Sequence, residues 1–422
     1  MPLAGLRALG AGSWSREKLR DFQARRLRAL VQHAYDRVPY YRDLFDRARL
    51  APADIQTLDD LLRIPTSQKN DFSERPETEV VARGVNPRRI ITYPTGGSTG
   101  IPMIVRCTRS ESRLLQMFRM QAMMQLGLRV RDRRSFVTII RGRDQSGPLQ
   151  RLGLFPIRKT NAVWPSDRIL ADLRAWKPDV IRGYPSTLSS LAAELTDADR
   201  AAILPRCLVT DSENLMPHMR LQIETGFRAP VFDFYDCFEC NVIARQCATG
   251  NQYHVLDAAV IVEIVRDGKP VRPGETGEVV ITPLHSWASP LIRYRIGDLA
   301  VRGADRCACG AGHSCIARVE GRVQDAIALA DGRLIASHVF IGPITPLYPN
   351  LRRYQIVQKA IDQIVITLQP IPGEPPSRAR LDAFAATIRQ NLGEAIRLDV
   401  ELVDDIPSEP NGKFRTFRNL WR

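Results

Sequence analysis

The sequence predicts an α/β protein with a large amino-terminal domain and a small carboxy-terminal one. Short β-branched runs alternate with helix-like stretches over the first half, which is typical of parallel sheets flanked by helices. Close-spaced strands joined by tight turns follow, and they indicate an antiparallel β-subdomain over about 254–320. The remainder mixes strands, a proline-rich break and one helix, as a compact α+β domain does. We therefore expect domains over 1–320 and 321–422.

The first element is expected to be a helix, because apolar side chains recur at three- and four-residue spacing between Leu27 and Ala34. This helix should end near Val38, since Pro39 disfavours helical geometry in the residue before it. Further along, we expect strands at 89–93, 103–107, 135–140, 207–210 and 231–235, and helices at 110–126 and 186–195.

The second half is marked by turn dipeptides such as Asp267-Gly268 and Pro273-Gly274. They separate expected strands at 254–256, 259–265 and 277–282. After Gly321, we expect strands at 354–358, 363–368 and 398–403 and a helix at 377–392.

Composition is that of an ordinary globular protein, with 44% hydrophobic and 25% charged residues. The formal net charge of +14 comes mainly from scattered arginines, without a dense basic run interleaved with aromatics. We therefore expect no nucleic-acid partner, and the charge suits polyanionic small molecules such as ATP and coenzyme A equally well. The sequence shows no signal peptide, and no apolar run reaches the ~18 residues of a membrane span. The expected location is the cytoplasm.

A glycine-rich loop, Thr95-Gly96-Gly97-Ser98-Thr99-Gly100, stands between two of the expected strands. Its glycines permit close approach of the backbone to a phosphate, and successive N–H groups can form an anion-binding concavity. The loop is not of the Walker type, because no Gly-Lys-Ser/Thr follows it. Taken alone, it is equally well interpreted as a polar hairpin turn.

This loop resembles the signature of the adenylate-forming superfamily, and the rest of the chain resembles the phenylacetate–coenzyme A ligase branch. The segments 38–42 and 64–69 are similar to the opening of that branch. The resemblance covers essentially the whole chain and implies a small carboxy-terminal domain that is mobile. It also implies that ATP activates a small-molecule carboxylic acid, with an aryl acid as the family default. The resulting acyl-adenylate is then transferred to a thiol, with coenzyme A as the expected acceptor.

The segment 233–239 resembles the Tyr-Gly-x-x-Glu element of the superfamily. The resemblance places Tyr235 beside the adenine and assigns Glu239 to Mg²⁺, which needs oxygen ligands next to a triphosphate. The alternative for Glu239 is a carboxylate at a helix start, stabilised by the helix dipole. Asp236 replaces the usual glycine, so the loop is expected to be less tightly turned.

Two further segments, 294–298 and 319–325, resemble the Tyr-Arg-Thr-Gly-Asp element and the interdomain hinge. By resemblance, Asp298 accepts hydrogen bonds from the ribose hydroxyls and Arg322 lies near ribose or phosphate. Gln324 stands where the family usually has an acidic hinge residue, and 328–335 departs from the glycine-rich family sequence. These departures concern the second half-reaction, in which the acyl group passes from the adenylate to the thiol.

Lys413, in Pro410-Asn411-Gly412-Lys413, resembles the family's catalytic lysine, which neutralises charge that develops during adenylation. The alternative is an exposed lysine in a glycine turn. Weaker matches place Glu213 against the adenine and make Tyr184 and Phe234 candidate walls of the acyl pocket, with packing in the core as the alternative.

Three cysteines, Cys307, Cys309 and Cys315, crowd into ten residues, and thiolates at such spacing are typical zinc ligands. Some members of the branch carry a Cys-x6-His pair and a later Cys-x-Cys-Gly. The resemblance therefore implies a structural zinc site of Cys247, His254, Cys307 and Cys309, with His313 and Cys315 as alternative ligands. Free thiols are the remaining interpretation.

Two other functions stay open. The acyl group of the adenylate could pass to an amine, a hydroxyl or a carrier-protein thiol, in polysaccharide or natural-product biosynthesis. The chain could also be a non-catalytic nucleotide-binding protein on the same scaffold, although Glu239, Asp298 and Lys413 occurring together argue against this. Neither the identity of the acid nor the oligomeric state follows from the sequence.

Overall fold

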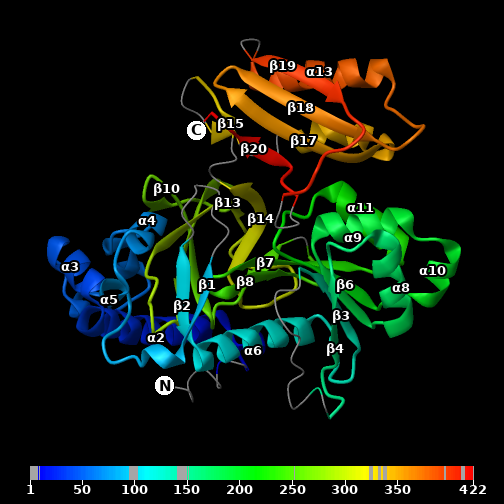
Figure 1. Cartoon of the computed structure of the whole chain (residues 1–422). Coiled ribbons are helices and arrows are strands. Elements are labelled where there is room, and N and C mark those ends of the chain that lie inside the picture. The colour runs from blue at the N-terminus through cyan, green and yellow to red at the C-terminus, as the bar shows by residue number, and fades with distance from the viewer. Residues whose placement is uncertain are drawn as a thin grey trace. The chain divides into compact units, whose positions relative to one another are not determined.

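The computed structural model describes residues 8, 10–94, 103–139, 150, 152–250, 252–322, 327–330, 334–335, 340–393, 396–409 and 414–421. Their contacts divide the chain into two compact units (Figure 1). The first unit comprises Met1–Leu128 and Phe234–Val319, and the second comprises Arg129–Asp233 and Glu320–Arg422. The division of the sequence into 1–320 and 321–422 stays a prediction.

The first unit begins with helices joined by short turns. Helix α2 (Arg16–Arg37) starts at the N-cap Ser15, whose side chain accepts a hydrogen bond from the Lys18 N–H. It ends at Val38, as predicted, and Pro39 then opens helix α3 (Pro39–Arg47), where a missing N–H costs nothing. The shorter helices that follow are η2 (Pro52–Asp54), η3 (Asp59–Arg63), α4 (Lys69–Ser73), α5 (Glu77–Val80) and η4 (Pro87–Arg89).

Strands β1 (Ile90–Pro94) and β2 (Ile104–Thr108) form an antiparallel pair of their own. We expected them within largely parallel sheets, and this expectation is wrong. The connection between them is too short for the crossover that a parallel pair requires. The glycine-rich loop 95–100 lies in this connection and outside the described residues.

An antiparallel sheet occupies most of the first unit, in the order β11-β10-β12-β13-β14-β9-β8-β7. Antiparallel pairing already begins at the β7–β8 hairpin, upstream of the expected residue 254. One apolar core joins this sheet to α2 and α3 through side chains such as Leu30, Tyr41 and Ile281. The strands are β7 (Val231–Cys237), β8 (Asn241–Gln246), β9 (Tyr253–Val255), β10 (Val260–Arg266), β11 (Lys269–Pro270), β12 (Thr276–Pro283), β13 (Tyr294–Arg302) and β14 (Cys315–Arg322).

Helix α6 (Arg109–Gln125) is attached to this antiparallel sheet by polar contacts as well as apolar ones. Near its start, the buried Glu111 accepts backbone hydrogen bonds from Trp287 (2.5 Å) and Ala288 (2.9 Å), while its other oxygen completes the capping box at the helix start. At its end, the Gln125 side chain accepts a hydrogen bond of 2.9 Å from Arg245. The helix is therefore held at its start by the backbone of 287–288 and at its end by strand β8.

The second unit contains the predicted strands β3, β6 and β7 together with β4 and β5, which were not predicted, and all are parallel in the order β7-β6-β5-β3-β4. Its helices pack on this sheet through one apolar core that includes Val137, Leu188 and Ile223 (Figure 1). The elements are β3 (Arg134–Thr138), β4 (Ile157–Asn161), α8 (Ser166–Trp176), β5 (Val180–Gly183), α9 (Pro185–Glu194), α10 (Asp197–Ala202), β6 (Cys207–Thr210) and α11 (Pro217–Phe227).

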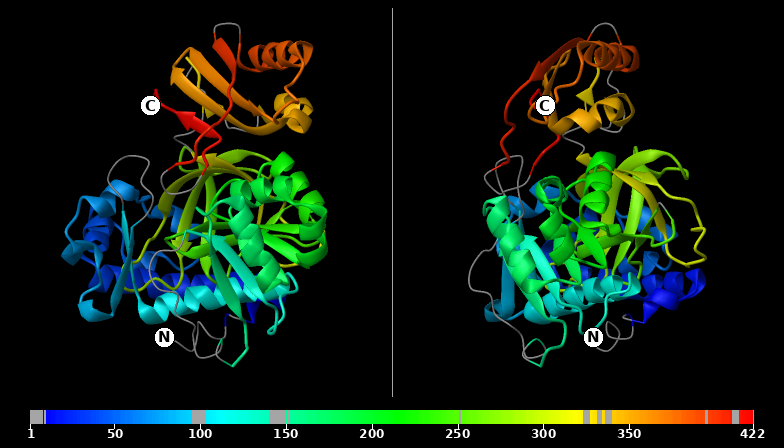
Figure 2. Two further views of the ribbon diagram at one scale, coloured as in Figure 1. Left: turned by 45° about the vertical axis from the view of Figure 1, so that its right-hand side comes forward. Right: turned by 90° about the vertical axis from the view of Figure 1, so that its right-hand side faces the viewer.

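The rest of the second unit is a four-stranded sheet in the order β19-β18-β17-β20, with helix α13 (Arg378–Leu392) along one face (Figure 2). The predicted strands and helix of this region are confirmed. The apolar core under α13 also takes in Met216 and Met219 at the start of α11. The elements around α13 are β15 (Ile327–Ala328), β16 (Leu334–Ile335), α12 (Ile341–Ile344), η7 (Thr345–Asn350), β17 (Leu351–Ala360), β18 (Gln363–Pro370), β19 (Arg397–Leu402) and β20 (Phe417–Asn419). Among the helices of the described ranges, none has the length and apolar character that a membrane crossing requires.

A buried histidine joins α2 to the antiparallel sheet. His285, only 1% exposed, donates from Nε2 to the Ala258 carbonyl (2.8 Å) and accepts at Nδ1 from the Arg26 guanidinium (3.3 Å). Burial, together with the charge of Arg26, lowers the pKa of His285 to about 4. The imidazole is therefore neutral in the folded protein at neutral pH.

This histidine should make the protein sensitive to acid. Between pH 6.5, the ordinary histidine pKa, and about pH 4, this histidine is protonated in the unfolded chain but neutral in the folded protein. The free energy of unfolding therefore decreases as the pH falls through this range. The shift corresponds to about 3 kcal/mol of unfolding free energy. We expect His285→Gln to flatten the decline measured by urea unfolding between pH 6.5 and pH 4. An unchanged slope in this variant would contradict the assignment.

Candidate functional site

Two of the sequence elements meet in the first unit. The Tyr235 hydroxyl on β7 donates a hydrogen bond of 2.7 Å to the Asp298 carboxylate on β13, across 63 residues of sequence. Both side chains are buried, each with 8% exposed. Because a carboxylate offers about four lone-pair positions, Asp298 keeps acceptor capacity for a ligand hydroxyl. The contact joins the residue predicted beside adenine to the residue predicted at the ribose.

Glu239 lies in the turn between β7 and β8, where it is half-buried. No helix starts at this position, so the alternative interpretation as a helix-start carboxylate is wrong. Cys237 pairs with Asn241 across the turn, and Asn241 adopts the left-handed conformation with φ of 70°. The carboxylate therefore sits at the tip of a tight hairpin that follows directly on Tyr235.

Arg119 of helix α6 holds both ends of this hairpin. Its Nη2 donates to the Asp236 carboxylate (2.7 Å) and its Nε donates to the Asn241 side-chain oxygen (2.6 Å). The side chains of the ion pair are only 14% and 11% exposed, so solvent screens this contact weakly. No motif in the sequence pointed to Arg119. The acidic residue in place of the family glycine at 236 was the available signal, because a buried carboxylate needs a cation.

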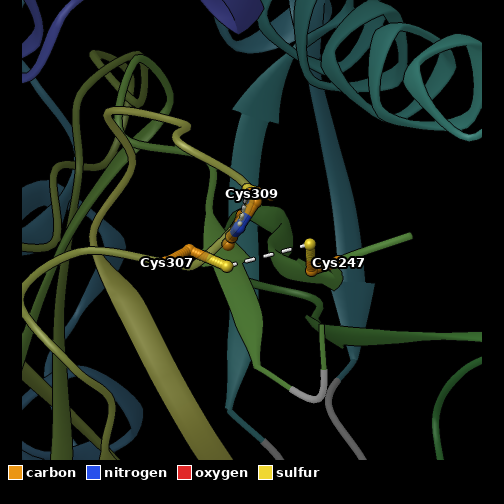
Figure 3. A group of neighbouring side chains, drawn as sticks. Cys247, Cys307 and Cys309 are labelled. Atoms are coloured by element: carbon orange, nitrogen blue, oxygen red, sulfur yellow. Dashed lines mark hydrogen bonds between the residues drawn. The ribbon is translucent and has the colours of Figure 1, made fainter. Parts of the chain in front are cut away.

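The four predicted zinc ligands come together from three separate segments of the first unit. Cys247 follows β8, His254 lies on β9, and Cys307 and Cys309 lie between β13 and β14. One potential ligand atom from each of the four falls within 4.8 Å of all the others. The three cysteine side chains point toward one another (Figure 3).

The spacing of these donors fits a tetrahedral Zn²⁺. With Zn–S of about 2.3 Å and Zn–N of about 2.0 Å, tetrahedral geometry requires S···S near 3.8 Å and S···N near 3.5 Å. The Cys307 and Cys247 sulfurs are 3.8 Å apart, and the Cys309 sulfur lies 3.5 Å from His254 Nε2. A site with four protein ligands leaves no open position, so its role would be structural.

Two of these donors have protonation states that suit a metal, whereas burial raises the pKa of Cys307. Burial opposes ionisation of Cys247, but hydrogen bonds from Thr249 and the neighbouring cysteines outweigh it and lower the pKa of the thiol to about 7. Burial lowers the pKa of His254 to about 4, which keeps the imidazole in the neutral form that binds metals. The Ala311 N–H points at the Cys309 sulfur at 3.4 Å.

The two alternative ligands have other contacts. His313 Nδ1 lies 3.3 Å from Asp257, and the Cys315 thiol donates to the His313 carbonyl. Neither residue belongs to the group of metal donors found among the described side chains. Burial raises the pKa of Cys315 to about 12, as it also raises that of Cys307, so the choice against Cys315 rests on its position.

The second unit holds other predicted site residues. The Glu213 carboxylate accepts hydrogen bonds from the Ser186 N–H (3.1 Å), at the start of α9, and from the Phe414 N–H (3.0 Å). It therefore anchors the residue next to Lys413, although Lys413 itself lies outside the described residues. Tyr184 is 8% exposed, and its hydroxyl lies 3.2 Å from the hydroxyl of Thr138 at the end of β3.

Arg322 is an exposed residue at the end of β14. Before it, Gly321 has φ of 104°, and a Cβ atom there would lie 3.0 Å from the Asn214 side chain, so only glycine fits without strain. Phe234, in the first unit, is 2% exposed. The nucleotide and acyl roles of Arg322, Glu213, Tyr184 and Phe234 stay predictions. Gln324 and the loop Thr95–Gly100 fall outside the described ranges.

The metal assignment predicts one Zn²⁺ per chain. Cys307→Ser should lose the metal and lower the melting temperature, because a structural zinc contributes directly to folding energy. Cys315→Ser should retain the metal. Elemental analysis of the purified proteins, together with thermal unfolding, measures both. Loss of zinc from Cys315→Ser with retention in Cys307→Ser would reverse the assignment.

Comparison with known proteins gives relatives along the whole chain. A phenylacetate–coenzyme A ligase of Thermus thermophilus is 24% identical over 440 aligned residues, which cover 96% of this chain and 97% of the relative. The enzyme of that name from Escherichia coli is 27% identical over 67% of each chain. Residues 327–419 match the family model of the CapK C-terminal domain. Protein CapK of Staphylococcus aureus is 24% identical over 58% of this chain and 53% of its own.

Solved structures agree in fold. A 2-hydroxyisobutyryl-CoA ligase in the postadenylation state, in complex with R3-HIB-AMP, superposes with a TM-score of 0.79 at 19% identity, over 98% of this chain and 91% of that one. An anthranilate CoA ligase in complex with anthranoyl-AMP gives a TM-score of 0.58 at 16% identity, over 79% and 67%. The chain is therefore similar to phenylacetate–coenzyme A ligases over almost its whole length and shares its fold with solved acyl–coenzyme A ligases.

Proposed function

We propose that this protein uses ATP to activate a carboxylic acid as an acyl-adenylate and then transfers the acyl group to the thiol of coenzyme A. The observation that carries the proposal is the 2.7 Å contact between Tyr235 and Asp298. It joins two nucleotide-binding elements of the family in one buried place. A relative aligned over almost the whole chain, named as a phenylacetate–coenzyme A ligase, supports the same activity.

The first half-reaction is attack by a carboxylate oxygen of the acid on the α-phosphorus of ATP, with pyrophosphate as the leaving group. In the second, the acceptor thiol attacks the acyl carbon and AMP leaves. The protein contributes position and electrostatics rather than a covalent intermediate. Asp298, held in orientation by Tyr235, would accept hydrogen bonds from the ribose hydroxyls.

Glu239 would hold Mg²⁺, which neutralises charge on the phosphates. The hairpin that carries this carboxylate is fixed by Arg119 at both ends, so the oxygen ligand is positioned before ATP arrives. The loop Thr95–Gly100 would bind phosphate through backbone N–H groups, and Lys413 would stabilise charge in the adenylation transition state. Arg322, Glu213, Tyr184 and Phe234 keep the nucleotide and acyl roles that the family resemblance predicts for them.

An aryl acid is the proposed substrate class, since relatives with aryl acids in their names occur among both sequence and structure matches. A second candidate function keeps adenylation but delivers the acyl group to an amine, a hydroxyl or a carrier-protein thiol. The departure of 328–335 from the family sequence, within the region that matches the CapK C-terminal domain, motivates this candidate. Mass spectrometry of products formed with and without coenzyme A separates the two.

Adenylation itself is tested by ATP–pyrophosphate exchange over a panel of aryl and fatty acids. Lys413→Ala should lower the exchange rate by about 100-fold or more, since it removes a cation that acts in the transition state. Lys359→Ala, which removes an exposed lysine of β17, is the matched control and should keep the wild-type rate. Full exchange in Lys413→Ala would refute its role, and ATP binding without exchange for any acid would favour a non-catalytic protein.

The Arg119 contact is tested through the metal. Arg119→Met should raise the Mg²⁺ concentration needed for half-maximal exchange by about 10-fold or more, because Glu239 loses its fixed position. Arg113→Met removes an exposed arginine of the same helix and should leave this concentration unchanged. If Arg119→Met lowers the exchange rate without changing its dependence on Mg²⁺ concentration, Arg119 stabilises the fold and does not position the magnesium ligand.

A further inference from the structure

Two free cysteines flank the proposed magnesium ligand. Cys237 ends strand β7 and Cys240 precedes β8, and their sulfur atoms lie 3.5 Å apart across the hairpin that carries Glu239. Neither thiol belongs to the metal cluster. The two thiols are separated by two residues in a Cys-x-x-Cys arrangement, and the sulfur contact brings them close to the separation from which a local disulfide can form.

The surroundings confine any movement to the hairpin tip. Arg119 holds Asp236 just before Cys237 and Asn241 just after Cys240. The strand ends are therefore fixed, and only Phe238 and Glu239 lie between the two thiols. Phe238 is 54% exposed, so the tip is accessible to solvent.

We propose that Cys237 and Cys240 form a reversible disulfide that displaces Glu239 and thereby weakens the binding of magnesium and ATP. The sulfurs must approach from 3.5 Å to a bond length of about 2.05 Å. This closes a small ring around the Phe238–Glu239 backbone. With the strand ends held by Arg119, the change is taken up by the residue that carries the carboxylate. The effect on catalysis rests on the proposed function, whereas the disulfide itself does not.

The oxidant is the disulfide of a low-molecular-weight thiol. Cys237 is the more accessible of the two residues, but its hydrogen bond with Cys240 and its burial raise the pKa of its thiol, so we expect the exchange to be slow at neutral pH. Its thiolate attacks one sulfur of this disulfide, which releases one small thiol. Cys240, which is 1% exposed, then attacks the Cys237 sulfur of the mixed disulfide and releases the second small thiol. The two cysteines are oxidised by two electrons, the small disulfide is reduced to two thiols, and the reverse exchange restores the open pair.

The test equilibrates the full-length, zinc-loaded protein with graded ratios of reduced and oxidised glutathione. Peptide mass spectrometry then measures the Cys237–Cys240 link, elemental analysis measures retained zinc, and titration measures MgATP binding. We expect the linked fraction to rise with oxidised glutathione while zinc is retained. The dissociation constant for MgATP should rise by about 10-fold in the linked protein and return after treatment with a dithiol.

Cys237→Ser and, separately, Cys240→Ala should make MgATP binding insensitive to the glutathione ratio. Cys207→Ser, which removes a buried thiol of β6, is the matched control and should respond like the wild type. The proposal is overturned if no Cys237–Cys240 link forms while the zinc cysteines stay intact, or if the linked protein binds MgATP as before. A linked protein with weakened MgATP binding but no pyrophosphate exchange for any acid would leave the disulfide standing and refute the proposed activity.

Discussion

The attachment of helix α6 to the antiparallel sheet is the constraint on which the site depends. Glu111 fixes the start of the helix to the backbone at 287–288, and Gln125 fixes its end to Arg245. Between them, Arg119 reaches the two ends of the Glu239 hairpin. These contacts are largely shielded from water, so losing one partner would leave a buried polar group unsatisfied. The helix thereby fixes the position of the hairpin that carries Glu239, the proposed magnesium ligand.

Much of the fold could be predicted because the relevant signals are local. The end of α2 at Val38 follows from Pro39, and α13 follows from its apolar spacing and a proline-rich break. The antiparallel β1–β2 pair was missed because β-branched runs do not encode their partners. Pairing depends on the length of the connection and on tertiary contacts, which periodicity does not report.

The residues of the candidate site also fall into those that the sequence predicts and those that depend on tertiary contacts. Motif residues such as Tyr235 and Asp298 could be named from order along the chain, and the structure adds that they touch. The zinc donors could be named from spacing and resemblance, and the choice against His313 and Cys315 required their three-dimensional contacts. Arg119 was invisible, because a single arginine among many in an amphipathic helix carries no pattern of its own.

The departure at position 236 has a practical consequence for protein engineering. Asp236 and Arg119 form an ion pair, although they lie 117 residues apart in the sequence. A chimera with the family glycine at 236 and the present helix would leave the half-buried Arg119 guanidinium without its carboxylate partner. A chimera that keeps Asp236 but replaces the helix would leave the carboxylate without its cation. Segments 109–125 and 236–241 are therefore best transplanted together, and a design that scores each position separately would misjudge both.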